Sequence, residues 1–259
     1  MKAKKLLVII RDLSFVVVFL ASAALWADTI VYDHFNDNNL DSNWIIDYSY
    51  ADGWTYSETG TNLSVTDVSS TIYNSGGGGT WGQAILQQNF NPVTDFNLGF
   101  NMSWDSQGSN SCMQFLRIYL MSDAGTIVGG AGYVDQSQVN SGMRYSQIGT
   151  VQFYAGSGDL PLSGSASINI SRDTNNDVDI LWNGASILSG ENSEEITKIL
   201  LTFGFYWGDF GYTQSFFGTG QVDLISLEGT PVPIESPIPE PTTIILIGCA
   251  IVGLVRRKK

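Results

Sequence analysis

The central part of the chain consists of short apolar runs that never take the 3.6-residue spacing of an amphipathic helix. Runs rich in Val, Ile, Thr, Tyr, Phe and Trp recur between residues 28 and 238, separated by Gly, Asn, Asp and Ser. This pattern is typical of strands bounded by turns. The sequence therefore predicts an all-β domain, with strands at 62–68, 83–88, 96–104, 113–121, 126–133, 166–171, 178–182, 185–188, 196–206 and 221–227.

The clearest local signal is the segment SASINISRDTNNDVDILWNGASILSG at 165–190. Alternate residues of 166–170 and of 178–182 are apolar, so each set lies on one face of a strand. Asn183-Gly184 then follows, a pair that favours two-residue hairpins because both positions accept positive φ. Two consecutive antiparallel hairpins are predicted here.

Charge and rare residues limit the function classes. Residues 28–238 hold four basic residues against 23 acidic ones, a formal charge of −19. Clustered Lys and Arg are needed to bind phosphates, so nucleic acid is excluded as a partner, and an anionic membrane surface is disfavoured. About 210 residues suffice for one domain. Cys112 is the only cysteine there and His34 the only histidine of the chain, which excludes an intrachain disulfide and multi-histidine metal sites.

The first 27 residues have the three parts of a secretory signal peptide. Residues 2–11 carry four cations, an apolar stretch spans 14–25, and small residues follow it. Ala21-Ser22-Ala23 matches the A-x-A cleavage pattern, and Ala27 offers a second cleavage site. Export of the following residues is expected.

The last residues have a complementary pattern. An apolar stretch runs from Ile244 to Val255 and ends at four cations, 256–259. It is shorter than the about 20 residues of a permanent membrane helix. Basic residues beside an apolar segment hold that end in the cytoplasm. A short, weakly held membrane helix is predicted.

This tail resembles the PEP-CTERM sorting signal of Gram-negative bacteria. Its parts are Pro239-Glu240-Pro241, the short helix, and a basic terminus that begins with Arg256 and Arg257. The resemblance implies processing by an exosortase, a membrane-embedded cysteine peptidase, after transient anchoring in the inner membrane. The body would then reach the cell envelope, the outer surface or the extracellular matrix.

The body itself is similar to the concanavalin A-like lectin/glucanase group, including laminin-G-like domains. The similarity lies in IVYDHFNDNNLDSNW at 30–44, GWTYSETGTNLSVTD at 53–67, the DVDILWNGASI hairpin and the closing VDLISLEG at 222–229. It implies a two-sheet antiparallel jelly-roll sandwich whose first and last strands pair. The expected organisation is a signal peptide (1–27), the sandwich (28–230), a Pro-rich linker (231–238) and the sorting signal (239–259).

Glucanases of this group carry an E-x-D-x-x-E pattern on one strand, which brings two carboxylates to one glycosidic bond. Glu58, Glu228 and Glu235 have no such partners, and ENSEE at 191–195 has the wrong spacing. The expectation is therefore a protein that is not an enzyme. A glycan-cleaving enzyme with rearranged carboxylates and a purely structural matrix or adhesion protein remain the alternatives.

Calcium is the one cofactor that the acidic loops suggest. DTNNDVD at 173–179 spaces acidic and amide residues two apart, but Val178 and Gly184 stand where an EF-hand needs Gly and Glu. Asp and Asn are also ordinary turn formers. A hairpin turn is the preferred interpretation, while a Ca²⁺ site assembled from distant loops could use Asp173, or Asp33 with Asp37.

Aromatic residues in Gly-rich segments are the candidate carbohydrate-binding residues. FYWGDFGYTQSFFGTG at 205–220 contains Trp207 and Tyr212, and ADGWTYSETG at 51–60 contains Trp54 and Tyr56. Exposed rings stack on the apolar face of a sugar. The alternative is that these rings pack against the core. The sequence predicts an exported surface or matrix protein that binds extracellular polysaccharide.

Overall fold

A computed structural model describes residues 27–35, 37–50, 54–58, 62–67, 71–73, 80–106, 112–136, 141–207, 213–215 and 218–232. Every regular element in these ranges is a β-strand, and neighbouring strands run antiparallel, which confirms the all-β prediction. Among these residues no helix has the length and apolar character needed to cross a membrane. Both predicted terminal helices, Pro239-Glu240-Pro241, Arg256 and Arg257 lie outside the described residues.

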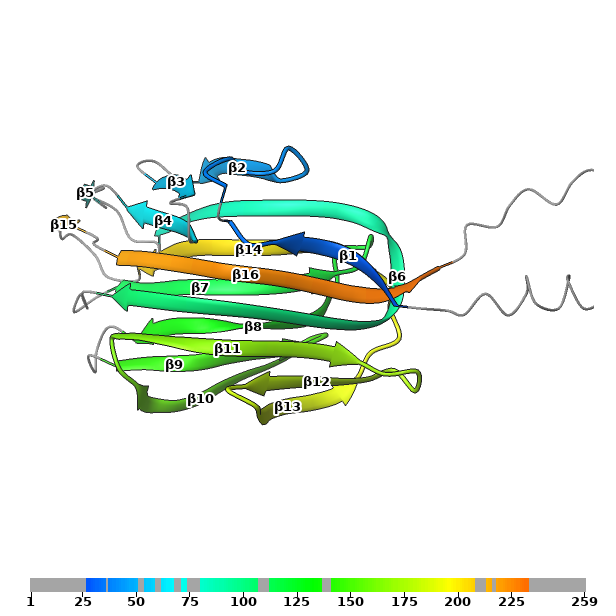
Figure 1. Ribbon diagram of the computed structural model, residues 1–259. Coiled ribbons are helices and arrows are strands. Elements are labelled where there is room, and N and C mark those ends of the chain that lie inside the picture. The colour runs from blue at the N-terminus through cyan, green and yellow to red at the C-terminus, as the bar shows by residue number, and fades with distance from the viewer. Residues whose placement is uncertain are drawn as a thin grey trace, which may run out of the picture.

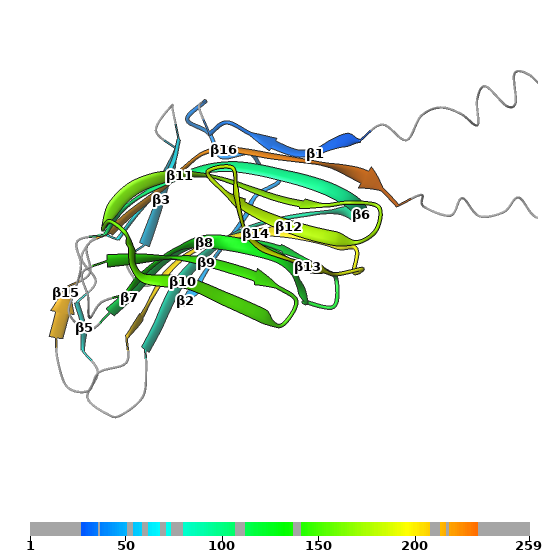
Figure 2. The same cartoon turned by 90° about the horizontal axis from the view of Figure 1, so that it is seen from below.

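The strands form two facing layers (Figures 1 and 2). The first, called here the β7 sheet, has the strand order β10 (Val151–Leu160), β9 (Ser141–Ile148), β8 (Ile127–Gln136), β7 (Cys112–Met121), β14 (Ile196–Trp207), the first half of β6 (Thr80–Ser106) and β2 (Ile45–Tyr50).

The second layer, called here the β11 sheet, begins at the second half of β6. On one side it continues through β11 (Ser163–Arg172), β12 (Asp177–Trp182) and β13 (Ala185–Glu191). On the other side lie β16 (Gly218–Pro231), then β1 (Asp28–Asp33) and β4 (Leu63–Asp67), and beyond β4 the strand β3 (Trp54–Glu58). A separate pair joins β5 (Thr71–Tyr73) to β15 (Thr213–Ser215).

Strand β6 belongs to both layers. Its residues up to Val93 pair with β14, and those from Val93 onward pair with β16 and then β11 as well. The bend is visible at one end of the molecule in Figure 1. Two separate strands were predicted here, at 83–88 and 96–104, with Pro92 in the segment between them. The prediction was wrong on this point: the ladders shift register near Val93, where a proline is tolerated.

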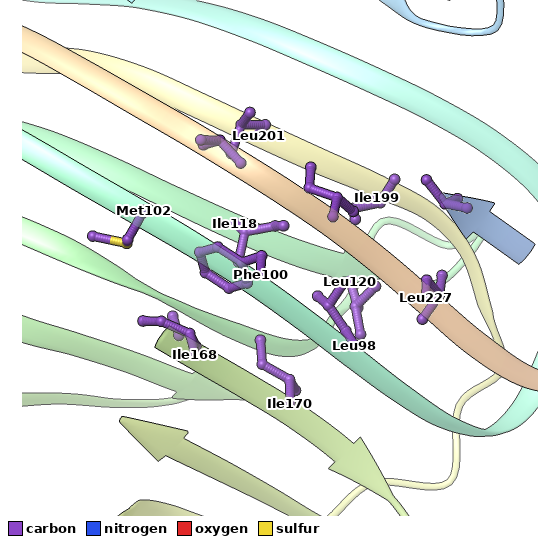
Figure 3. Close-up of a cluster of buried hydrophobic side chains, with 14 of the residues drawn as sticks. Leu98, Phe100, Met102, Ile118, Leu120, Ile168, Ile170, Ile199, Leu201 and Leu227 are labelled. Atoms are coloured by element: carbon purple, nitrogen blue, oxygen red, sulfur yellow. The ribbon is translucent and has the colours of Figure 1, made fainter. Parts of the chain in front are cut away.

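The core lies between the layers. In Figure 3 the inward side chains of the two sheets face each other: Leu98, Phe100, Met102, Ile168, Ile170 and Leu227 from the β11 sheet, and Ile118, Leu120, Ile199 and Leu201 from the β7 sheet. Each of them is at most 2% exposed. Burial of one such side chain stabilises the fold by about 1.5–3 kcal/mol, so this double layer dominates the stability of the domain.

Both predicted hairpins are present. Strand β11 pairs with β12, and β12 pairs with β13. The turn between β12 and β13 has φ of 49° at Asn183 and 80° at Gly184, as the dipeptide predicts. The implied pairing of the first and last strands is also confirmed, since β1 runs along β16 from Asp28 opposite Gly229 to Asp33 opposite Ile225. This is a jelly-roll sandwich.

Candidate functional site

The outer face of the β7 sheet, turned away from the core, carries an aromatic and polar cluster. On β7 the inward positions Leu116, Ile118 and Leu120 are buried in the core, so strand alternation points Phe115, Arg117 and Tyr119 outward. A strand buried on one face only usually shows polar residues outside. Here that place is taken by two rings and one cation, which is the first sign of a site.

Two rows of residues cross the sheet at this point. In one row Thr202, Arg117, Gly132, Tyr145 and Tyr154 stand opposite one another on β14, β7, β8, β9 and β10. In the next row the same strands contribute Leu200, Tyr119, Gly130, Gln147 and Gln152. Residues opposite each other in antiparallel strands share a face. The side chains of both rows therefore meet outside the sandwich.

Arg117 lies between two rings. Its guanidinium carbon is 4.5 Å from the centre of the Phe115 ring and 4.3 Å from the centre of the Tyr145 ring. Nη1 of Arg117 donates a hydrogen bond of 3.2 Å to the hydroxyl oxygen of Tyr119. Stacking of this kind contributes about 0.5–2 kcal/mol, more where water is excluded. The guanidinium is thus held in one position on an otherwise aromatic surface.

Tyr145 is the buried centre of the cluster. Its ring meets Tyr119 edge-on at 6.0 Å between centroids and Tyr154 at 5.3 Å. Tyr145 is 1% exposed, whereas Tyr154 is 41% exposed. Burial raises the pKa of Tyr145, so its hydroxyl stays protonated and keeps its donor role. We call four residues the tyrosine–arginine cluster: Arg117, Tyr119, Tyr145 and Tyr154. Tyr145 is its buried centre, and Tyr154 is its exposed edge.

Gln147, which lies in the neighbouring row, holds the hydroxyl of Tyr145 in place. The hydroxyl of Tyr145 donates to Oε1 of Gln147, which also accepts a 3.3 Å bond from Nε2 of Gln152. Nε2 of Gln147 in turn donates to the carbonyl oxygen of Gly149 at 2.8 Å. Every polar group of this buried amide is therefore used, and the rings above it rest on a rigid support.

Two glycines on β8 make room for these contacts. A Cβ at Gly130 would lie 2.6 Å from Cδ1 of Tyr119, and one at Gly132 would lie 2.6 Å from Cα and 3.0 Å from Cγ of Arg117. The two distances of 2.6 Å are too short for any residue with a Cβ. The absence of side chains at Gly130 and Gly132 lets groups from β7 reach across β8 to β9.

A hollow of 990 Å³ opens at the end of the same sheet, where β6 bends. Gln87, Asn89, Lys198 and Thr197 contribute to its lining from β6 and β14, and the acids that line it are Asp123, Glu194 and Glu195. Gln87 stands opposite Leu200, which in turn stands opposite Tyr119. The hollow and the tyrosine–arginine cluster thus belong to neighbouring parts of one sheet.

The predicted carbohydrate-binding residues are not brought together by the described structure. Trp54 and Tyr56 lie on β3 of the β11 sheet, whereas Trp207 ends β14 in the β7 sheet. The side chains of these three residues, and the whole of Tyr212, lie outside the described part. Their predicted role stays a prediction.

The carboxylates of the acidic loops accept hydrogen bonds from N–H groups of this chain. Oδ1 of Asp33 accepts a hydrogen bond of 2.7 Å from the backbone amide of Phe35. Oδ2 of Asp33 accepts one of 2.8 Å from Nε1 of Trp44. Oδ1 of Asp37 accepts the amide of Asn39 at 2.9 Å. In the hairpin, Asp173 Oδ1 accepts the amides of Asn175 and Asp177 at 2.9 and 3.0 Å. Within the described ranges no group of three or more His, Cys, Asp or Glu is placed to hold a metal ion.

The tyrosine–arginine cluster was missed by sequence reasoning, although a signal was present. The segment FLRIYL at 115–120 alternates core residues with Phe115, Arg117 and Tyr119, and MRYSQ at 143–147 repeats the alternation with Tyr145 and Gln147. Strands β9 and β10 were not predicted, because their glycines and polar residues obscure the period. Without them the cross-strand neighbours of Arg117 could not be found.

Other proteins resemble this chain in fold but not in sequence. The sequence matches no protein-family model and no curated protein. In fold, the chain is similar to the CBM2 module of the evolved Dit protein of Lactobacillus casei BL23 phage J-1 (TM-score 0.55, 9% identity, 80% of this chain and 97% of that chain).

Two enzymes are similar in fold as well. The GlcNAcα1-4Gal-releasing endo-β-galactosidase from Clostridium perfringens gives a TM-score of 0.53 at 10% identity, over 79% of this chain and 63% of that chain. The catalytic domain of an endo-1,3-β-glucanase (laminarinase) from Thermotoga petrophila RKU-1 gives 0.51 at 11% identity, over 79% and 98%. This chain thus spans less than two thirds of the Clostridium enzyme. The fold is the jelly-roll sandwich that these structures share, as the resemblance of the body implied.

The prediction that the chain is not an enzyme is contradicted by these neighbours. It rested on the missing E-x-D-x-x-E pattern and on the scarcity of histidine. Two of the three structures above are named as glycan-cleaving enzymes, so the fold itself hosts glycan cleavage. At identities of 9–11% the likeness shows the fold alone, and no residue role is transferred from those proteins.

Proposed function

We propose that this chain is an exported glycan-binding protein whose ligand lies on the outer face of the β7 sheet, over the tyrosine–arginine cluster. The observation that carries the proposal is the contact network of Arg117, Tyr119, Tyr145 and Tyr154, which leads from the buried Tyr145 to the exposed Tyr154. The neighbours support the same class, since they include a module named as a CBM and enzymes named for glycan substrates.

The chemistry of the cluster suits a sugar. Tyr154 offers an accessible ring that can stack on the C–H face of a pyranose. Tyr119 and Arg117 are partly exposed beside it and provide donors for ring hydroxyls. Tyr145 and Gln147 form a buried support that keeps Arg117, Tyr119 and Tyr154 in place before the ligand arrives. This reduces the conformational entropy that is lost on binding.

A glycan array with the full chain tests the proposal. Tyr154→Ala should weaken retention of the bound glycan about threefold to tenfold, because one stacked ring contributes about 0.5–1.5 kcal/mol beyond its buried area. Tyr32→Ala is the matched control, since Tyr32 is 58% exposed but lies on β1 of the other sheet. An array without retained glycans, or equal retention by the wild type and Tyr154→Ala, would contradict the proposal.

Glycan cleavage is the second candidate function. It is favoured by the enzymes among the neighbours and by Asp123, Glu194 and Glu195, which line the hollow at the end of the β7 sheet. Glycosidases use a pair of carboxylates around the scissile bond. The test is release of reducing ends from soluble β-1,3-glucan and from mucin glycans. Release that Glu194→Gln or Glu195→Gln abolishes would support cleavage, and no release would overturn it.

Export and sorting belong to the same proposal. Residues 1–27 direct the chain out of the cytoplasm, and the tail 239–259 anchors it until an exosortase-type peptidase removes the helix. The body then acts at the cell envelope, the outer surface or in the extracellular matrix. Comparing a chain that lacks 239–259 with the intact chain tests this. Recovery of both in the same fraction, with the intact chain still carrying its apolar tail, would contradict processing.

A further inference from the structure

The outer face of the β11 sheet is covered largely by polar side chains. Its strands β6, β11 and β16 bury Phe100, Met102, Ile168 and Val222 toward the core. The positions between them point to the opposite side of the molecule from the tyrosine–arginine cluster. These outward positions are hydroxyl and amide residues: Asn97, Asn101, Ser103, Ser163, Ser165, Ser167, Asn169, Ser171 and Gln221.

A hollow of 680 Å³ lies on this face, within the size range of small-ligand sites. Its floor comes from three adjacent strands, because Ser103 of β6 stands opposite both Ser165 of β11 and Gln221 of β16. Asn101 stands opposite Ser167 in the next row. Asn62 and Asn183 also line it.

The wall at Asn183 is rigid. The side-chain Oδ1 of Asn183 accepts the amide of Ser167 at 2.9 Å, and the amide of Asn183 donates to the carbonyl oxygen of Ser167 at 2.8 Å. This double contact fixes the β12–β13 turn against the edge of the hollow. The site therefore has a defined shape before any ligand enters.

Much of the hydrogen-bonding capacity in the hollow is unused. Ser103 Oγ donates to Oε1 of Gln221 at 3.1 Å, and Nε2 of Gln221 has no hydrogen-bond partner among the described residues. Within the described part of the chain, the side chains of Asn101, Ser165 and Asp223 make no hydrogen bond, although all three line the same hollow. Donors and acceptors thus converge on one space without satisfying each other.

The charge and polarity of the groups that line the hollow limit the class of ligand that can bind there. Among the described residues, the lining has hydroxyls, amides, one carboxylate, Asp223, and the apolar Met102 and Ala166, but no basic residue. Residues 28–238 together carry a formal charge of −19. An anionic ligand would be repelled, and an apolar one would leave the polar groups unpaired. A neutral polyhydroxylated ligand pairs with all of them.

We propose that this hollow is a second glycan-binding site, for neutral polysaccharide, on the face opposite the tyrosine–arginine cluster. With one site on each side of the sandwich, a single chain can hold two polysaccharide strands and cross-link them. The cross-linking role rests on the proposed function of the first site, whereas binding in the hollow does not.

The test uses the full chain with three neutral probes, a β-1,3-glucan hexasaccharide, a β-1,4-galactan hexasaccharide and desialylated mucin O-glycans. Ser165→Tyr fills the hollow, and the double variant Asn101→Ala, Gln221→Ala removes two of its amide side chains without adding bulk. Ser171→Tyr is the matched control, because Ser171 points outward from the same strand but does not line the hollow.

Calorimetric titration should give two sites per chain for the wild type and for Ser171→Tyr, and one site for either hollow variant. Light scattering should show large complexes of the wild type with soluble β-1,3-glucan, and none when Ser165→Tyr or Tyr154→Ala is used. A single site that Tyr154→Ala weakens and Ser165→Tyr leaves unchanged would overturn the second site and keep the first. Absence of binding to all three probes would overturn both.

Discussion

The guanidinium carbon of Arg117 lies 4.3 Å from the centre of the Tyr145 ring, although the strand β8 runs between the two residues. Gly132 is the residue of β8 that stands directly opposite both. Because Gly132 has no side chain, the arginine can lie across β8 and reach the ring. The candidate site thus depends on a residue that contributes no chemistry of its own.

Replacing Gly132 should therefore disrupt the cluster. Its Cβ would lie 2.1 Å from the carbonyl oxygen of Leu116 and 3.0 Å from Cγ of Arg117. Gly132→Val is expected to lower the free energy of unfolding by about 1–3 kcal/mol through overpacking, and to weaken glycan retention. Urea unfolding measures the first effect. The control is Gly99→Ala on β6, where a Cβ meets nothing within 4 Å. Equal stability of the two variants would contradict the role of Gly132.

Arg172 should be essential to the end of the sandwich where β6 bends. It is 3% exposed and donates from Nη1 to the carbonyl oxygens of Asn192 (3.1 Å) and Glu194, and from Nη2 to that of Val93 at 3.5 Å. Burial lowers the pKa of this guanidinium, which still stays charged.

Arg172→Met should therefore cost about 2–4 kcal/mol of unfolding free energy, because buried carbonyls lose charged donors. Arg172→Lys should not restore it, since an ammonium cannot reach several carbonyls in a fixed plane. Lys198→Met, at a partly exposed position, is the control. An Arg172→Met protein as stable as this control would show that the carbonyls find other partners.

Glu58 should make the fold pH-dependent. Its Oε1 accepts the amide of Asp37 at 2.9 Å, while Oε2 is buried without a hydrogen-bond partner among the described residues. Burial, together with the nearby Asp37 and Asp33, raises the pKa of Glu58 above its ordinary 4.5. A raised carboxyl pKa means that ionisation destabilises the folded state as pH rises through 4.5 and beyond.

Glu58→Gln should thus stabilise the protein at pH 7, and this gain should disappear below about pH 4, where the wild-type carboxyl is also neutral. Thermal unfolding at a series of pH values measures the difference. A variant that is less stable than the wild type at pH 7 would contradict the assigned direction.

Asp173 should have the opposite pH dependence. Hydrogen bonds from the amides of Asp177 and Asn175 lower the pKa of this exposed carboxyl below its ordinary 3.8. Its contribution is present above pH 3.8 and is lost as pH falls through the lowered pKa. Asp173→Asn should destabilise the hairpin turn at pH 7, and its difference from the wild type should shrink as pH falls below 3.8. A difference that persists unchanged at pH 2 would refute the electrostatic origin.

The sequence predicted those parts of the fold that depend on local patterns. The hairpins of 165–190 follow from alternation and from Asn183-Gly184, and both were found. The jelly-roll class followed from resemblance to a family. What failed was non-local: residues 83–88 and 96–104 were predicted as two strands, because a single sequence does not show that the register shifts of two ladders coincide near Val93 within one continuous strand.

The site depends on pairing of distant strands. Arg117 and Tyr145 are 28 positions apart, and their contact requires β8 to lie between them with Gly132 at one register. Alternation along FLRIYL shows that Arg117 faces outward but not what it meets. Aromatic residues in glycine-rich loops, such as Trp207 and Tyr212, drew the prediction because exposed rings are a simple compositional signal, whereas a cluster across four strands is not.

Hydrogen exchange of the full chain with and without its array-selected glycan tests the central claim most directly. The amides of β9 and β10, around Tyr145 and Tyr154, should exchange more slowly in the complex, and Tyr154→Ala should remove most of that protection. If the glycan is bound while amides of 141–160 exchange at the same rate as in the free chain, the ligand lies elsewhere and the account of the tyrosine–arginine cluster is wrong.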